Sequence, residues 1–118
     1  MSVDKKIINA LSALAPVERD EMSDLSVPGY TFNYNTLPMS YRSNKPVYER
    51  YLIQVHLFCP VDFNNLKLRE DTKLALFDAG FGWADEIDTG LEKEKPGDVT
   101  LRHFVYECEC TERILFER

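Results

Sequence analysis

Residues 47–59, with the sequence VYERYLIQVHLFC, constrain the fold of this chain more than any other stretch. Apart from Glu49, every odd-numbered position in it is apolar, whereas the even-numbered positions mix polar, charged and aromatic side chains. A period of two over the whole stretch indicates a long β-strand, because successive side chains of a strand point to opposite faces. We therefore expect the odd-numbered face to cover a hydrophobic core.

The even-numbered face of the same stretch has a different character. It carries Tyr48, Arg50 and Phe58 beside polar groups. The face is therefore more apolar than an ordinary solvent-exposed face and more polar than a face that covers a second core. Aromatic and arginine side chains are enriched at the centres of protein–protein interfaces. We expect this face to carry the function.

Two helices are expected to flank the strand along the chain. Ser2 is a suitable N-cap for a helix over residues 3–15, and Pro16 ends this segment. Residues 63–79 carry apolar side chains at helical spacing and are followed by Gly80, a suitable C-terminal residue for a helix.

The segments between the first helix and the long strand are shorter. Residues 30–34 alternate large aromatic and polar side chains, which is typical of a short strand, and the acidic residues 17–26 are assigned a short edge strand. Residues 37–46 contain two prolines and two serines. They predict a loop of about ten residues, and loops of this length are often functional.

The C-terminal third predicts a β-hairpin. Residues 95–98 read KPGD, with Pro at the second and Gly at the third position of a type II turn, and residues 99–110 form the returning strand. In the outgoing strand, the acidic residues that share one parity, and hence one face, are Glu86, Asp88 and Glu92.

The expected order of elements is helix, three strands, helix and two strands, within a single domain over residues 1–118. The helices are too few and too far apart for a series of parallel β-α-β units. We predict an α+β fold, in which an antiparallel or mixed sheet of four to five strands carries two helices packed on one face.

Composition limits the classes of function. The 20 acidic and 14 basic side chains leave a net charge of −6, and no cluster of Lys and Arg is visible along the sequence. This balance argues against a protein that binds nucleic-acid phosphates.

No apolar run reaches the roughly 20 residues of a membrane span. The odd number of cysteines, three, indicates a reducing compartment and no disulfide framework.

The cysteines and histidines do not predict a reactive centre. Cys108 and Cys110 share one strand face, but a zinc site needs three or four ligands, and the parity of His56 and Cys59 keeps them from converging on the pair. We expect the cysteines to be small buried hydrophobes. We expect His56 and His103 to be half-buried strand residues with hydrogen-bonded rings. Neither an enzyme activity nor a metal or cofactor is predicted.

Residues 85–98 hold six acidic residues and two lysines. A solvated strand face is the ordinary interpretation of such a run. A divalent-cation site is an alternative, since hard cations bind carboxylate oxygens, although the spacing fits no EF-hand loop. A surface that repels DNA is a third interpretation.

The order of these elements resembles the tail-completion and tail-terminator proteins of long-tailed bacteriophages. The resemblance covers about residues 2–110, and its marks are YLIQVHLF at 51–58, AGF at 79–81 and LRHF at 101–104. It implies an α+β virion protein that assembles in the host cytoplasm as a ring, a hexamer, on the end of the tail tube. Such a ring stops tube growth and joins the head connector, while DNA passes through the lumen without specific binding.

The resemblance carries over no catalytic residue and no fixed contact set. The residues that we expect to contact a neighbouring subunit, the tail-tube protein or the head connector are Tyr41, Arg42, Tyr48, Arg50, Gln54, His56 and Phe58. The residues expected to line an acidic lumen are Glu86, Asp88, Glu92 and Glu94. Residues 111–118 are expected either to reach a neighbour as a C-terminal arm or to pack on their own domain.

Two other functions remain open at this point. Another neck or head-completion adaptor would share the size, the acidity and the oligomeric habit. A small metal-dependent enzyme would use the acidic hairpin.

Overall fold

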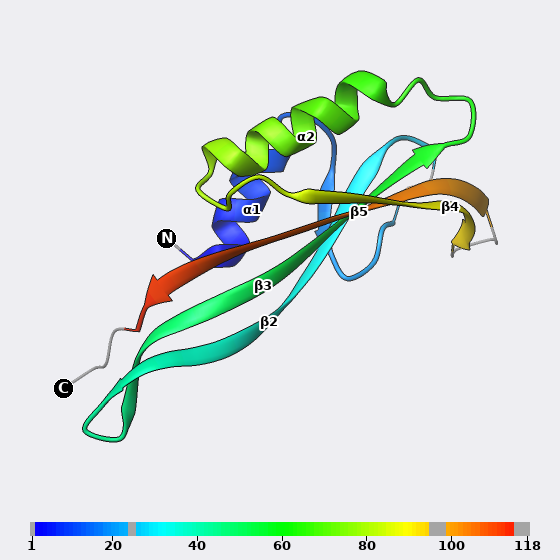
Figure 1. The fold of residues 1–118 in the computed structure, drawn as a ribbon. Coiled ribbons are helices and arrows are strands. Elements are labelled where there is room, and N and C mark those ends of the chain that lie inside the picture. The colour runs from blue at the N-terminus through cyan, green and yellow to red at the C-terminus, as the bar shows by residue number, and fades with distance from the viewer. Residues whose placement is uncertain (1, 24–25, 95–98, 115–118) are drawn as a thin grey trace.

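The computed structural model describes residues 2–23, 26–94 and 99–114, which form two helices and a five-stranded sheet (Figure 1). The elements in chain order are α1 (Val3–Leu11), β1 (Val17–Arg19), β2 (Gly29–Arg42), β3 (Lys45–Pro60), α2 (Leu66–Asp78), β4 (Asp85–Glu94) and β5 (Val99–Arg113). The strand order is β1-β2-β3-β5-β4; β1 and β2 are parallel, and the other neighbours are antiparallel. The predicted α+β fold with a mixed sheet and two helices on one face is confirmed.

β3 occupies the middle of the sheet, as its alternating pattern predicts. Ile53, Val55 and Leu57 are buried and pack with Leu11 of α1 and Leu76 of α2 in one hydrophobic core. Full burial of such a side chain contributes about 1.5–3 kcal/mol. The odd-numbered face of β3 therefore holds both helices on the sheet.

Polar contacts at the helices fit this arrangement. Ser2 caps α1 by accepting a hydrogen bond from the Lys5 N–H. α1 ends at Leu11, earlier than the predicted residue 15, because residues 12–15 turn the chain into β1. The Tyr30 hydroxyl lies 2.7 Å from Thr72 Oγ1, a buried contact that links β2 to α2.

The predicted loop over residues 37–46 is wrong. β2 continues to Arg42, and a two-residue turn of Ser43 and Asn44 leads directly into β3. The two turn residues have φ angles of 50° and 64°. Positive φ at both central positions is typical of the type I′ turn, whose twist suits the two strands of a hairpin.

The proline that favoured a loop is compatible with the observed strand. The Tyr30 N–H donates to the Pro16 carbonyl on the β1 side of β2. Because backbone groups alternate in direction along a strand, even-numbered residues of β2 face away from β3. Pro38 therefore has its missing N–H at the free edge, where no hydrogen bond of the sheet is lost.

The end of this hairpin projects beyond the helical layer as an arm, which comprises residues 37–50 and the neighbouring residues 111–113 of β5 (Figure 1). Side chains along the arm are exposed or half-buried. The molecule consequently measures 54 × 27 × 22 Å. Within the described part of the chain, neither helix covers most of the arm (Figure 1).

The remaining predictions for segments have mixed outcomes. Of the described residues in the predicted strand over residues 17–26, only Val17–Arg19 form a strand. Residues 111–113 belong to β5, opposite β3, so the start of the predicted C-terminal arm packs on its own sheet. The turn over 95–98 and residues 115–118 lie outside the described residues. No described helix combines the length and apolar character needed to cross a membrane.

Candidate functional site

The sheet face opposite the helices, here called the open face, carries the even-numbered side chains of β3 and the odd-numbered side chains of β5. Five of the predicted contact residues lie on it, namely Tyr48, Arg50, Gln54, His56 and Phe58. The other two, Tyr41 and Arg42, lie at the end of the arm. Their role as contacts with partner proteins stays a prediction.

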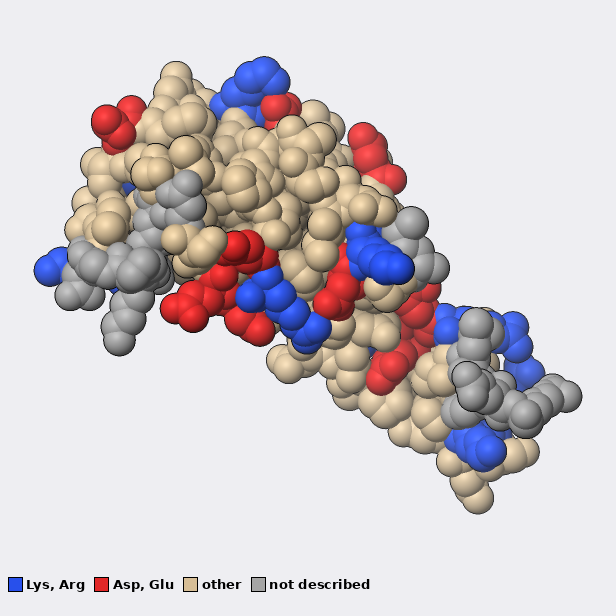
Figure 2. All heavy atoms as spheres, turned by 180° about the vertical axis from the view of Figure 1, so that it is seen from behind, with Lys and Arg blue, Asp and Glu red and all other residues tan. Residues whose placement is uncertain are grey.

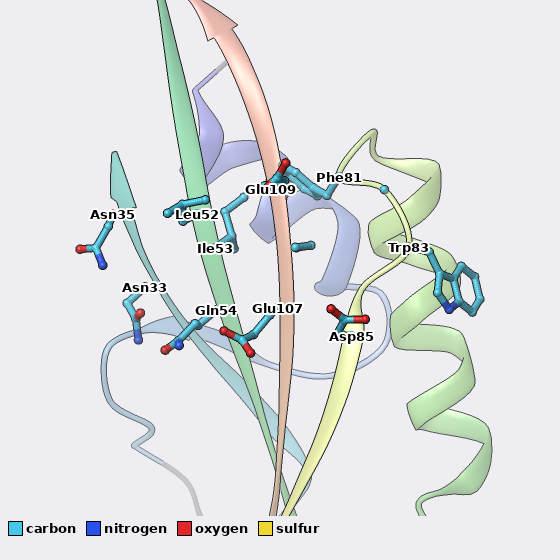
Figure 3. Close-up of a pocket in the computed structure, with 12 residues that line it drawn as sticks. Asn33, Asn35, Leu52, Ile53, Gln54, Phe81, Trp83, Asp85, Glu107 and Glu109 are labelled. Carbon is cyan, nitrogen blue, oxygen red and sulfur yellow. The ribbon is translucent and has the colours of Figure 1, made fainter. Parts of the chain in front are cut away.

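A hollow of about 580 Å³ lies between the middle of the open face and the loop before β4 (Figure 3). Its polar lining consists of three amides and three carboxylates: Asn33, Asn35, Gln54, Asp85, Glu107 and Glu109. Phe81 and Trp83 line the side nearest α2. The hollow comes from four strands and one loop, so only the assembled sheet creates it.

Two carboxylates of this hollow oppose each other. Asp85 of β4 is the direct cross-strand partner of Glu107 of β5. Like charges at directly opposed positions are destabilising, and neither carboxylate forms an ion pair with a residue of the described ranges. Glu109, by contrast, accepts a 2.5 Å hydrogen bond from Arg50. The hollow therefore has unbalanced negative charge.

A row of polar side chains crosses four strands on the open face. Glu92 Oε2 lies 2.7 Å from His103 Nδ1, and His103 Nε2 lies 2.7 Å from His56 Nδ1. His56 Nε2 completes the row 3.3 Å from Asn33 Nδ2. Phe58 stacks on His103 with ring centroids 4.4 Å apart. Both rings are hydrogen-bonded as predicted; His56 is half-buried as predicted, whereas His103 is buried. The sequence did not show that the two rings contact each other.

Burial sets the charge state of His56. Removal of the ring from water lowers its pKa below the usual 6.5, and the neighbouring His103 lowers it further, while Glu92 acts in the opposite direction. The ring is therefore held mainly neutral at neutral pH. A neutral imidazole has one donor and one acceptor nitrogen, which is sufficient for its two contacts in the row.

Glu86 does not lie on a solvated acidic face as predicted. Its carboxylate accepts 2.6 Å hydrogen bonds from Arg69 Nη2 of α2 and from the Tyr106 hydroxyl of β5. The Arg69 hydrogen bond is the main cause that holds the pKa of Glu86 below its usual 4.5. Arg69 also lies over the Phe104 ring, 4.5 Å from its centroid. This cluster joins α2 to the sheet.

The prediction that Glu86, Asp88 and Glu92 share one face is also wrong. A bulge between Asp88 and Gly90 shifts the register, so that Asp88 pairs with Phe104 and Gly90 pairs with His103. One extra residue inverts the parity of everything beyond it. Glu86 and Asp88 therefore lie on the helix side, and Glu92 lies on the open face. The side chain of Glu94, the fourth predicted lumen residue, lies outside the described part.

The end of the arm gathers positive charge that the sequence did not reveal. Arg42, Lys45 and Arg113 line a hollow of about 220 Å³ together with Pro46, Val47 and Ile114. Figure 2 shows Lys and Arg at the end of the arm and Asp and Glu over the middle of the molecule. No cluster is visible along the sequence because Arg113 is distant in sequence from Arg42 and Lys45 and reaches the hairpin end only through the pairing of β5 with β3.

α2 presents apolar side chains to solvent as well as to the core. Leu74, Phe77 and Trp83 are about half exposed. Phe77 and Trp83 meet edge-to-face with centroids 6.0 Å apart, and the Lys73 ammonium lies 5.9 Å from the Trp83 ring. The sequence analysis did not identify this patch. The pattern that could have predicted it is the occurrence of apolar residues on all sides of the helix.

The cysteines are free thiols within or beside the core. Cys59 is buried, and Cys108 and Cys110 pack against the core on the helix side. Burial raises the pKa of Cys59 to about 11 and that of Cys108 to about 12, so both thiols stay protonated at neutral pH. The prediction of small buried hydrophobes is confirmed for Cys59, whereas Cys108 and Cys110 are only partly buried. No group of three or more His, Cys, Asp and Glu side chains in the described ranges is arranged to hold a metal ion.

The site is therefore a set of surfaces: an open face with an acidic hollow and a histidine row, and an arm with a basic end. Neither a scan against protein-family models nor a search of curated proteins finds a match to this chain.

Proposed function

We propose that this chain is a structural, non-enzymatic protein of a long-tailed bacteriophage. It assembles as a ring on the end of the tail tube, ends tube growth, and forms the surface that joins the tail to the head. Its partners are further copies of itself, the tail-tube protein and the head connector, and its place is the neck of the virion. The resemblance of the sequence to tail-completion and tail-terminator proteins motivates this assignment.

The observation that carries the proposal is the projecting arm. Its strands continue beyond the core that holds them, and its side chains, including Tyr41 and Leu37, are exposed. Such an extension adds exposed surface to the subunit but few contacts between buried side chains of its own chain. A ring needs two different patches on each subunit, one for each neighbour. The arm and the body of this chain are two such patches.

The charge of the chain fits passage of DNA through such a ring. Binding to phosphate groups requires cations, whereas a net charge of −6 repels them. Three basic residues lie together at the arm end, and others form ion pairs, such as Arg69 with Glu86.

Deletion of the gene from the phage genome that carries it tests the proposal. Electron microscopy of the resulting particles should reveal tails of abnormal length that are not joined to heads, and supply of the protein in trans should restore normal tails. Tails of normal length beside filled heads that leak DNA would assign the chain to head completion instead. Normal infectious virions would exclude both neck functions.

A further inference from the structure

The basic end of the arm has no access to the acidic hollow of its own subunit. Lys45 at the turn and Gln54 beside the hollow are nine residues apart on the same strand, β3. At about 3.4 Å per residue, a strand holds them about 30 Å apart. Both positions belong to one continuous hydrogen-bonded sheet, so the arm cannot fold back. Contact between the arm end and this hollow therefore requires a second copy of the chain.

The arm end and the hollow are complementary in charge. Arg42, Lys45 and Arg113 surround the small hollow at the arm end, and no acidic residue lines it within the described part of the chain. Asp85 and Glu107 oppose each other in the larger hollow without an ion pair among the described residues. Cations supplied from outside would relieve this like-charge repulsion.

The larger hollow also suits a protein segment in size and chemistry. Its volume of about 580 Å³ falls in the range of sites that bury a ligand, roughly 300–1,000 Å³. The amides of Asn33, Asn35 and Gln54 offer donors and acceptors for the polar backbone of a turn such as the one formed by Ser43 and Asn44.

We propose that the arm of one copy of this chain docks in the acidic hollow of a second copy, with Arg42 and Arg113 beside Asp85 and Glu107. The contact joins two different patches, so each docked copy still offers one free arm and one free hollow. Repetition of such a heterologous contact closes into a ring where the rotation permits it. This inference names the subunit contact of the ring in the proposed function and rests on that function for the ring itself.

Charge reversal with complementary pairs tests the contact. The first variant carries Arg42→Glu and Arg113→Glu, and the second carries Asp85→Lys and Glu107→Lys. We expect the wild type to self-associate at low ionic strength and high protein concentration in sedimentation velocity, and each variant alone to associate at least about tenfold more weakly, since opposed like charges suppress docking. An equimolar mixture should regain the wild-type affinity, because the acidic arm of one variant faces the basic hollow of the other.

The control variant carries Lys5→Glu and Lys93→Glu, two exposed cations of the body, and has the same net charge as the arm variant. It should associate like the wild type, while circular dichroism verifies that all variants are folded. Absence of self-association by the wild type, or failure of the mixture to recover, would overturn the inference. Retention of the wild type by duplex DNA through Arg42 and Arg113, without self-association, would assign the arm end to phosphate binding and would also overturn it.

The outcome is separable from that of the proposed function. Recovery by the mixture together with normal virions after gene deletion would establish the contact and reject the role in the phage neck. Abnormal tails after deletion, with no recovery by the mixture, would leave the neck function in place and reject this contact.

Discussion

At the scale of single residues, the open face depends on polar groups that satisfy one another across strands. Asn33, His56, His103 and Glu92 come from β2, β3, β5 and β4 and form one row of contacts. On the helix side, Glu86 binds Arg69 and Tyr106 in the same manner. Buried or half-buried polar groups of this kind are costly when they lose a partner.

The stability of the fold should depend on pH through His56. Its pKa is lowered in the folded state, so the unfolded chain, with a pKa near 6.5, binds more protons just below that value. The contribution of His56 to the free energy of unfolding should be at its full value above pH about 6.5 and should fall as the pH decreases below that value. Urea denaturation at several pH values measures this slope. The His56→Gln variant should have a flatter profile in this range; an unchanged slope would contradict the assignment.

The pair of Arg69 and Glu86 should contribute more to stability than the exposed pair of Arg50 and Glu109. Glu86→Gln leaves a partly buried guanidinium without its anion and should lower the free energy of unfolding by about 1–3 kcal/mol. Glu109→Gln, at a solvent-exposed pair, should cost at most about 1 kcal/mol. Equal losses in urea denaturation would show that the Arg69 cluster is not a major link between α2 and the sheet.

At the scale of elements, the hairpin of β2 and β3 is the unusual component. Its strands run through the core and continue as the arm, and a turn of two residues with positive φ closes it. The bulge in β4 is the second irregularity, since it moves Glu92 to the open face beside His103. Both features determine which side chains meet.

A better turn sequence should stabilise the arm. Ser43 and Asn44 adopt a left-handed conformation that is unfavourable for most residues, and Asn-Gly is the preferred pair for such a turn. The double variant Ser43→Asn and Asn44→Gly should raise the free energy of unfolding by about 0.5–1 kcal/mol, because relief of the left-handed backbone cost exceeds the entropic cost of glycine. Ser43→Val with Asn44→Val should lower it, because β-branched residues resist positive φ. If both double variants have wild-type stability in urea denaturation, the arm unfolds independently of the core.

At the scale of the whole molecule, charge is separated along the long axis. The arm end is basic, whereas the chain as a whole has a net charge of −6. The exposed apolar residues Leu74 and Phe77 of α2 and Trp83 of the loop before β4 form a local patch and not a broad apolar face. Obligate interfaces resemble a domain core cut in half, and no described surface of this chain has that character.

The purified protein should therefore be monomeric at micromolar concentration in physiological salt. At this ionic strength the Debye length is about 8 Å, so salt weakens the attraction between exposed charges. Light scattering should give the mass of one chain, 13.7 kDa, with rings forming on tail tubes or at low ionic strength. A stable hexamer in dilute solution at physiological salt would contradict this expectation.

The sequence by itself determined the local elements and the fold class. The alternating pattern of residues 47–59 predicted β3 and its core face, and both helices lie where helical spacing predicted them, with shifted ends. These features depend on the periodicity of contiguous residues, which tertiary contacts here do not override. The prediction of a loop over residues 37–46 was wrong because turn-forming residues also occur at strand edges and hairpin ends. At such positions Pro38 and Asn44 lower the stability of the hairpin only slightly.

Only the tertiary structure decided which distant residues meet. The contacts of His56 with His103, of Glu86 with Arg69, and the approach of Arg113 to Arg42 depend on strand pairing and on one bulge. Because a shift of one residue in register moves every later side chain to the opposite face, parity counted along the sequence is reliable only up to the first bulge. The acidic hollow and the basic arm end are therefore properties of the assembled sheet.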